Sequence, residues 1–313
     1  MLRLPKRDSG QALLIVLLTM AVILTVVLSV TARSVVDIST TSTSEDSLRA
    51  FSAAEAGVEQ VLLNETSATV TIDAGNNVGF VANLTRPLPG DEIIYTEPVD
   101  SGEFATFWFV SHNENTLKLD CSTGYCATVN QIRDLCWGEA TPNGQPNTPA
   151  VELSIYYDPA AEAGTLQAGV TDGDFSQLRV VRATYDAHTA RSATNHFNSI
   201  DASYSTTSPC VIGNRKFPFF VKNISVTSLG IRPQCWTYPG CLLMARVRLL
   251  YNTEGQSVGM NFQTTGGSRM PAQGFMVESR GTALDTVRSL NVFRSYPAPA
   301  SVFDSAVFSG SSI

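Results

Sequence analysis

The N-terminal part of the chain divides into an uncharged half and an amphipathic half. From Ser9 to Ala32 the sequence contains no charged residue. Basic residues flank this stretch on both sides, namely Arg3, Lys6, Arg7 and Arg33. About 20 apolar residues in an α-helix cross a bilayer core of about 30 Å. We therefore expect residues 11–32 to cross a lipid bilayer once, with the N-terminus in the cytoplasm because the positive flank precedes the span.

A cleaved secretory signal is the alternative interpretation of this stretch. Val30-Thr31-Ala32 satisfies the small-residue rule for cleavage. The apolar region of a secretory signal is usually about 7–15 residues long, however, and the uncharged stretch here is longer. Its length therefore favours a helix that stays attached to the protein.

Residues 33–64 continue the helical pattern with an amphipathic face. Neither Pro nor Gly occurs between Gln11 and Ala56, and these are the residues that most readily end a helix. The pattern predicts one helix from Gln11 to about Leu62, on the order of 75 Å long. We expect fraying at residues 39–44, where Ser and Thr side chains compete for backbone hydrogen bonds.

Residues 52–59 of this helix carry mostly small side chains. Ala53, Ala54 and Gly57 leave room for a sheet to approach closely, so the segment is predicted to dock on a β domain. Glu55 has two interpretations, a solvated residue or a specific contact between subunits.

Beyond Asn64 the pattern changes to short runs rich in β-branched and aromatic residues, which predict strands. The candidate strands are residues 68–72, 106–110, 151–157, 177–183, 216–224, 242–251, 259–264, 274–278 and 287–293. In residues 245–249 apolar positions alternate with Arg246 and Arg248, so we expect both arginines to face the solvent.

The predicted fold class is α+β, a long N-terminal transmembrane helix followed by a mostly antiparallel β-sheet or β-sandwich domain. The Pro- and Asn-rich residues 141–150 are expected to form a linker or a long loop. They would separate a small β-rich region, 65–140, from a β-rich extracytoplasmic domain, 151–313.

Charge and cysteine usage restrict the function further. The formal net charge of −7 and the lack of a basic run argue against a nucleic-acid partner. An even number of cysteines beyond a membrane segment indicates disulfides in an oxidising compartment. The candidates are Cys121, Cys126, Cys136, Cys210, Cys235 and Cys241. The two short spacings suggest locally closed loops, which would leave Cys136 and Cys210 to pair, but the sequence alone does not choose among the pairings.

The sequence carries no catalytic constellation, so we expect no enzyme, no cofactor and no metal site. His112, His188 and His196 do not match a metal-binding spacing and are expected at the surface. Neither a nucleophile elbow nor a phosphate-binding loop occurs. Asp172 and Asp174 are the best candidates for a cation site, but two acids are too few for a calcium loop and favour a plain turn.

Aromatic residues are the remaining candidates for recognition. Most of them are expected in the core, because large apolar patches are rare on soluble surfaces. The set is Trp108, Trp137, Trp236, Phe219 and Phe220. Trp236, inside a short cysteine loop, is the candidate for an adhesive contact.

The leader and the helix together resemble a known family. A short basic leader, 1–10, followed by an uninterrupted apolar helix resembles a type IV prepilin. The opening SGQALLIVLL and the later Phe51-Ser-Ala-Ala-Glu-Ala-Gly57 are similar to PilX-type minor pilins, the PilX N-terminal domain family. Tip pseudopilins of type II secretion are also similar. The resemblance covers about residues 6–62.

The resemblance implies processing, partners and place. A prepilin peptidase would cut after Gly10 and methylate Gln11. Helix-packing positions would be Thr25, Ser29, Phe51, Ala53, Ala54, Glu55 and Gly57. The implied partners are other pilin subunits, the prepilin peptidase, the inner-membrane assembly machinery and the lipid bilayer. The protein would be a single-pass inner-membrane protein with an extracytoplasmic C-terminal domain, present in a surface pilus when assembled.

One departure from the family pattern concerns the start of the helix. Major pilins carry a Glu at the fifth position of the mature chain, where it neutralises the N-terminus of a neighbour. Here that position is Ile15, and the first acid of the helix is Asp37. A buried ammonium without its partner is costly, so a repeating subunit is disfavoured and a minor component at a tip or in an initiating complex is expected. The alternative function is a membrane-tethered or secreted adhesin-like binding domain that never enters a filament.

Overall fold

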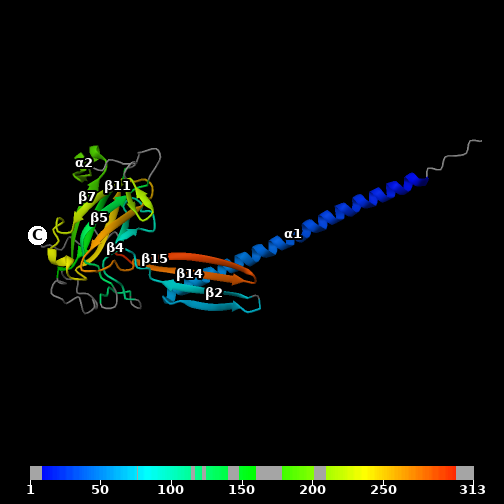
Figure 1. Cartoon of the computed structure of the whole chain (residues 1–313), viewed down its shortest axis with the longest axis horizontal. Coiled ribbons are helices and arrows are strands. Elements are labelled where there is room, and N and C mark those ends of the chain that lie inside the picture. The colour runs from blue at the N-terminus through cyan, green and yellow to red at the C-terminus, as the bar shows by residue number, and fades with distance from the viewer. Residues whose placement is uncertain are drawn as a thin grey trace, which may run out of the picture. The chain divides into compact units, whose positions relative to one another are not determined.

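The computed structural model describes residues 9–75, 77–113, 117–121, 125–139, 148–159, 178–200 and 209–300. The chain forms two compact units. One, here the helix unit, comprises Met1–Leu84 and Val277–Val292, and the other, here the β unit, comprises Thr85–Met276 and Phe293–Ile313. Figure 1 labels several helices and strands of each unit.

The helix unit begins with α1, a single helix of 56 residues from Ser9 to Asn64, so the predicted long helix is confirmed. The expected fraying at residues 39–44 is wrong, because the helix runs through this segment without a break. The hydroxyl groups of Thr40 and Thr41 donate to carbonyl oxygens one turn earlier, each at 2.8 Å. The threonine side chains therefore add to the helical hydrogen bonds instead of replacing them.

The sheet of the helix unit joins strands from the two ends of the sequence. Its order is β1-β2-β14-β15. The bounds are Ala68–Asp73 for β1, Val78–Thr85 for β2, Gly274–Ala283 for β14 and Thr286–Ser295 for β15. Strands β14 and β15, which follow most of the β unit in sequence, thus complete the sheet on which the first helix rests.

The β unit contains two larger sheets. The first has the order β4-β12-β6-β7-β8, with Phe104–Trp108, Leu242–Leu250, Ala150–Tyr157, Arg179–Asp186 and Asn198–Ser199. The second has the order β11-β5-β13-β3, with Phe219–Ser225, Val129–Trp137, Val258–Thr264 and Glu92–Ile94. Strands β9 (Cys210–Ile212) and β10 (Arg215–Phe217) form a hairpin. The short helices are α2 (Thr189–Asn195) and η3 (Pro233–Trp236).

One hydrophobic cluster joins the two larger sheets. It contains Phe107 and Leu153 from the first sheet and Leu135 and Phe262 from the second, all buried. The rings of Phe107 and Phe262 are 6.2 Å apart in an edge-to-face arrangement. Apart from the parallel β7–β8 pair, the pairings recorded between the described strands of these sheets are antiparallel. The expected α+β fold with a mostly antiparallel sheet is confirmed, and the finer expectation of a sandwich stays a prediction.

Three details differ from the sequence expectation. The candidate strand 216–224 is two strands, β10 and β11, which meet at Pro218, a residue that cannot donate to a ladder. Strand β5, from the expected small region, pairs with β13 from the expected larger domain, so the sheets cross that boundary. Within the expected linker, residues 141–147 lie outside the described residues.

Arg246 is the third difference. It was expected in solvent, and it is only 3% exposed. Its guanidinium lies 4.0 Å from the ring centroid of Phe104 on the neighbouring strand β4. Successive side chains of β12 alternate between the two faces of its sheet. One face is the hydrophobic core, and the other is also covered at Arg246 instead of being open to water.

Candidate functional site

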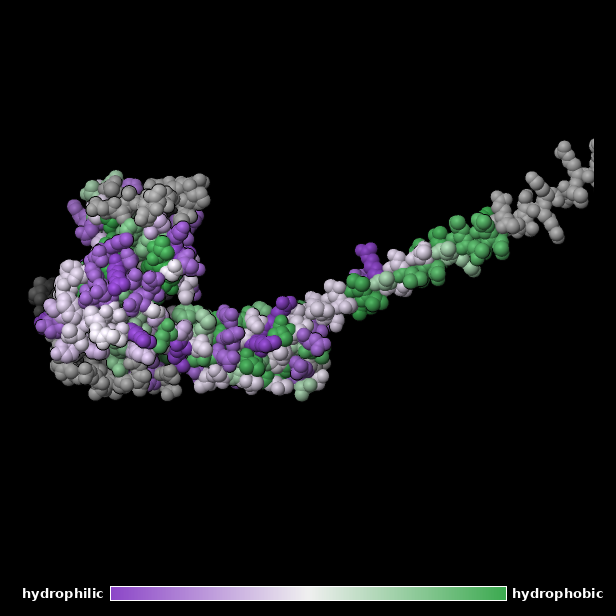
Figure 2. All heavy atoms as spheres, in the orientation of Figure 1, coloured by the Kyte–Doolittle hydropathy of each residue, from purple (hydrophilic) through white to green (hydrophobic). Residues whose placement is uncertain are grey.

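The first half of α1 presents apolar side chains on all sides. Between Leu13 and Val30 the large apolar residues are 53–67% exposed. Figure 2 shows this stretch of the helix as a continuous hydrophobic surface. By length and composition the helix is able to cross a membrane. An apolar surface of this size is not stable in water and needs lipid or another apolar partner.

The predicted processing and packing positions of this half lie on the same helix. Gly10 and Gln11 are within the first turn of α1. The Thr25 hydroxyl donates to the Val22 carbonyl at 2.8 Å, so its polarity is satisfied inside the helix, and Ser29 is exposed one turn later. Cleavage, methylation and interhelical packing at these residues stay predictions.

The second half of α1 is fastened to the sheet of the helix unit through small residues. Ala53, Ala54 and Gly57 are buried. A side chain at Gly57 would meet the Phe80 ring at 2.8 Å as well as the hydroxyl of Ser279. The predicted close docking of residues 52–59 on strands is thus present in the structure.

Gly281 makes the second close approach in this interface. A Cβ atom at Gly281 would collide with the backbone of α1 at Ala50 and Ala54. Beside it, the Arg288 guanidinium donates to the Ser47 hydroxyl at 2.6 and 2.9 Å. At Gly281 the helix and sheet backbones therefore touch, whereas at Gly57 the helix backbone lies against side chains of the sheet.

The other two motif residues point away from this interface. Phe51 is 40% exposed, and Glu55 is exposed as well. The motif from Phe51 to Gly57 therefore has a buried part, which packs on the sheet, and a more exposed part, which comprises Phe51 and Glu55. A contact between this exposed part and another subunit stays a prediction.

Three disulfides pair all six cysteines of the chain, as Cys121–Cys126, Cys136–Cys210 and Cys235–Cys241. The first and last close short loops, and the second joins β5 to β9 across a sequence separation of 74. This is the connectivity that the two short spacings suggested. Disulfides persist in oxidising compartments, which indicates that the β unit lies outside the cytoplasm.

The three histidines do not form a site together. His112 is 8% exposed, so its expected surface position is wrong. Its ring stacks on Tyr296 at 4.1 Å and meets Trp108 edge-on at 4.6 Å. Burial lowers the pKa of His112 to about 4. His188 caps the N-terminus of α2 by accepting the Arg191 backbone N–H at 3.2 Å, and the exposed His196 ends that helix.

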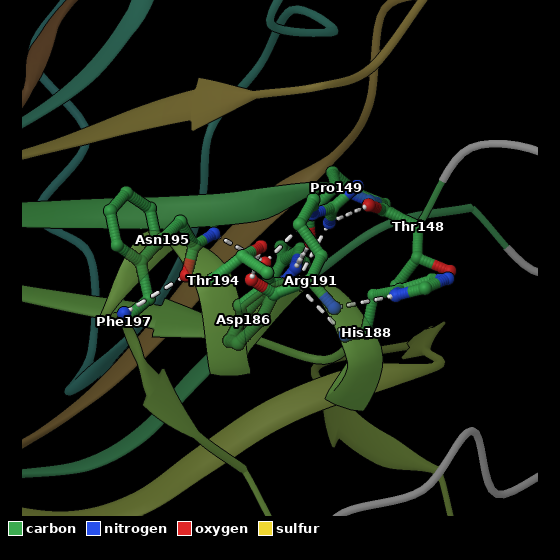
Figure 3. A network of polar contacts seen from close by, with 9 residues as sticks. Thr148, Pro149, Asp186, His188, Arg191, Thr194, Asn195 and Phe197 are labelled. Atoms are coloured by element: carbon green, nitrogen blue, oxygen red, sulfur yellow. Dashed lines mark hydrogen bonds and ion pairs between the residues drawn. The ribbon is translucent and has the colours of Figure 1, made fainter.

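The strongest polar cluster in the β unit surrounds a buried carboxylate, Asp186, at the end of β7. Figure 3 shows its partners converging from α2 and a neighbouring loop. Arg191 donates to both carboxylate oxygens at 2.7 and 2.8 Å, the His188 N–H donates at 2.8 Å and Asn195 donates at 2.9 Å. Arg191 also donates to the Thr148 carbonyl at 2.6 Å. The cluster thus clamps α2 to β7 and to Thr148, two residues before β6.

The charges in this cluster are compensated, which points to a structural role. Burial raises the pKa of Asp186, but the hydrogen bonds from Arg191, His188 and Asn195 lower it by more than burial raises it. The pKa of Asp186 therefore lies below its ordinary value. The Arg191 guanidinium also lies 4.2 Å over the ring of Tyr251. A carboxylate so fully bonded is neither a base nor a ligand. The sequence did not indicate the contacts of Arg191 with Thr148 and Tyr251, because these two residues come from distant parts of the chain.

The remaining candidates divide between core and surface. Trp137, Trp108 and Phe219 are buried, as expected for most of the aromatic set, whereas Trp236 and Phe220 are partly exposed. Asp172 and Asp174 lie outside the described residues. In the described part of the chain, no three His, Cys, Asp or Glu side chains gather as metal ligands.

Two hollows adjoin strand β4 at Thr106, one of them also lined by Arg246, and the sequence did not indicate them. Comparison with known proteins found no matching family model, no similar curated protein and no similar solved structure.

Proposed function

We propose that the chain is a minor pilin-like subunit, anchored in the inner membrane by α1, with its β-rich part outside the cytoplasm. One observation carries the proposal, the division of α1 into an exposed apolar half and a half held against a sheet. A plain membrane anchor needs only about 20 residues, and this helix continues well beyond that length as a single rod.

The proposed mechanism is assembly and not catalysis. The apolar half stores the subunit in the bilayer. When the subunit leaves the membrane, packing against other helices replaces lipid contacts of similar polarity, so the transfer costs little. Thr25 and Ser29 lie one turn apart and would sit at that helix–helix contact. The glycine contacts at Gly57 and Gly281 would keep the rod and its sheet together while force acts on the helix.

The lack of an acid near the start of the rod supports a minor role. With Ile15 at the fifth position after Gly10, the first acid of the helix is Asp37. A neighbour's buried positive N-terminus would therefore stay without compensation in a repeating array. We place the subunit at a tip or in an initiating complex, with other pilin subunits, the prepilin peptidase and the inner-membrane assembly machinery as partners.

The test is the chemical nature of the mature N-terminus. The full chain is expressed with and without a prepilin peptidase, and the purified protein is examined by intact-mass measurement and N-terminal sequencing. N-methylated Gln11 that depends on the peptidase, and that is lost in a Gly10→Val variant, is the expected result. A product that begins near Ser34 indicates secretion, and an unchanged Met1 indicates a tether, and either result overturns assembly in favour of a surface binding domain.

A further inference from the structure

Strands β3 and β4 are the end strands of the two larger sheets of the β unit. Within the described residues, neither strand has a partner strand on its outer edge. The two strands lie close together, because the ring centroids of Tyr95, directly after β3, and of Phe107 in β4 are 6.1 Å apart. An open sheet edge favours unwanted strand pairing, and natural proteins commonly cover it with a loop or a helix. These two edges are therefore places where a covering segment is expected.

A pocket of about 260 Å³, here the apolar pocket, lies between the two strands. Strand β3 contributes Ile93 and Ile94 to its lining, and strand β4 contributes Phe107. Ile93 and Phe107 belong to the hydrophobic cluster of the β unit, whereas Met276, also in the lining, is 39% exposed. The pocket thus connects the core with the surface and presents an apolar lining, which is favourable to bury.

The lining of the apolar pocket favours an apolar group. Glu92 is its charged residue, and the Glu92 carboxylate already accepts the Gly213 N–H at 2.8 Å. The side chain of Gln273 is also occupied, since its oxygen accepts the Trp108 N–H at 2.7 Å and its nitrogen donates to the Trp108 carbonyl at 3.0 Å. Pockets for drug-sized ligands usually have volumes of about 300–1,000 Å³. A smaller pocket, whose described lining residues include no cation, suits one large apolar side chain of a polypeptide.

The chain itself passes this pocket shortly before its last described residue. Ser295 lines the apolar pocket, and residues 295–300 line the hollow that adjoins it along β4. Tyr95 and Thr106 line both hollows. The residues that follow Ala300 therefore start beside the apolar pocket.

Residues 301–313 lie outside the described residues, and their sequence has the chemistry that the pocket requires. The apolar run at residues 302–308 contains two phenylalanines, Phe303 and Phe308. An extended chain advances by about 3.5 Å per residue, so the two phenylalanines reach up to about 10 Å and about 28 Å from Ala300. Both are therefore within reach of a pocket that adjoins the hollow beside Ala300.

We propose that the apolar pocket between β3 and β4 binds a phenylalanine of the chain's own C-terminal segment, residues 302–308. The docked segment covers part of the outer edges of both strands and so protects them from pairing with other chains. Burial of one Phe side chain is sufficient for about a tenfold excess of the docked over the undocked segment. The proposal does not depend on the fate of α1, so it is separate from the proposed function.

The first test measures the rate at which hydrogen peroxide oxidises Met276 in the full chain in detergent micelles, by peptide mass spectrometry. A docked phenylalanine shields the Met276 sulfur, so a variant with both Phe303→Ser and Phe308→Ser should be oxidised there about ten times faster. Asp304→Asn, which keeps both phenylalanines, is the matched control and should keep the wild-type rate. Met270 is fully buried and serves as the slow internal reference in every chain. Equal Met276 rates in the wild type and the double variant overturn the proposal.

The second test locates the segment by photo-cross-linking. The amino acid p-benzoylphenylalanine is introduced at position 303 or 308 of the full chain, where it keeps an aromatic side chain, and is activated by light. At least one position should form a cross-link within the chain to Met276 or Phe293 of the pocket, identified by peptide mass mapping. The same probe in place of Arg179, an exposed residue of β7, is the control and should not label the pocket. The lack of a cross-link to the pocket from both positions overturns the proposal.

Dilution distinguishes the chain's own segment from that of a second copy. Docking within one chain gives cross-links whose yield is independent of protein concentration, because the short tether sets the effective concentration. Cross-links that join two chains and disappear on dilution assign the pocket to a second copy, and this result overturns the proposal. The melting temperature of each variant is measured in parallel, and if the double serine variant fails to fold, the cross-links decide.

Discussion

The backbone of Gly281 in β14 lies directly against the backbone of Ala50 in α1, with no room for even a methyl group between them. Gly57 makes the reciprocal contact from the helix toward Phe80 and Ser279. Residues more than 200 positions apart in the sequence thus meet in one interface. Because backbone cannot move aside as a flexible side chain can, this interface should tolerate no enlargement.

Gly281→Ala should destabilise the helix unit by about 1–3 kcal/mol, the usual cost of overpacking. The measurement is chemical unfolding of the full chain in detergent, followed by circular dichroism. Gly90→Ala is the control, because a side chain there meets open space, and it should change stability by less than about 0.5 kcal/mol. Equal stability of the two variants would show that the helix–sheet contact is looser than described.

The stability of the β unit should fall between pH 6.5 and about 4 through His112. Burial lowers the folded-state pKa of His112 to about 4, so in this window the unfolded chain takes up a proton that the folded chain does not. The free energy of unfolding is therefore unaffected by His112 above pH 6.5. It decreases as the pH falls from 6.5 to about 4, by on the order of 3 kcal/mol in all.

The check on this prediction is the pH dependence of unfolding in a His112→Phe variant, which keeps an aromatic ring beside Trp108 and Tyr296. The variant should show a flatter curve between pH 6.5 and 4. His196→Asn, which changes an exposed histidine and tolerates the left-handed backbone at that position, should keep the wild-type curve. A wild-type slope in His112→Phe would remove this residue as the cause.

Asp186→Asn should cost about 3 kcal/mol, at the lower end for breaking a buried ion pair because the Arg191 side chain is 23% exposed. Glu152→Gln, which breaks the more exposed pair with Arg182, is the control and should cost less than about 1 kcal/mol. Both are measured by urea unfolding. Since the folded-state pKa of Asp186 lies below its ordinary value of 3.8, the stability that it provides is present above pH 3.8 and is lost as the pH falls through the lower folded-state value.

Replacing Cys136 and Cys210 by Ser should destabilise the β unit by about 4 kcal/mol, because this bridge closes a long loop in the unfolded chain. The same change at Cys121 and Cys126 should cost about 2 kcal/mol, because that loop is short. The sequence separations are 74 and 5. Comparable losses in the two double variants would mean that strain or local packing, and not loop length, determines the effect.

The sequence by itself determined the features that depend on neighbours along the chain. The long helix follows from an apolar and amphipathic pattern with neither Pro nor Gly between Gln11 and Ala56, and the two short disulfide loops follow from their spacing. Small residues near Gly57 indicated where a sheet would dock. Local pattern is sufficient in these cases because helix formation and short loop closure involve residues close in sequence.

Only the tertiary structure decided which distant segments meet. The sequence did not show that β14 and β15 would join β1 and β2, or that Arg246 would be covered, because alternation in a strand marks two faces without saying what lies on each. The Arg191 bond to the Thr148 carbonyl and the Gln273 amide on Trp108 likewise bring together residues from separate parts of the chain. Such contacts form only when whole elements pack, and so no local pattern records them.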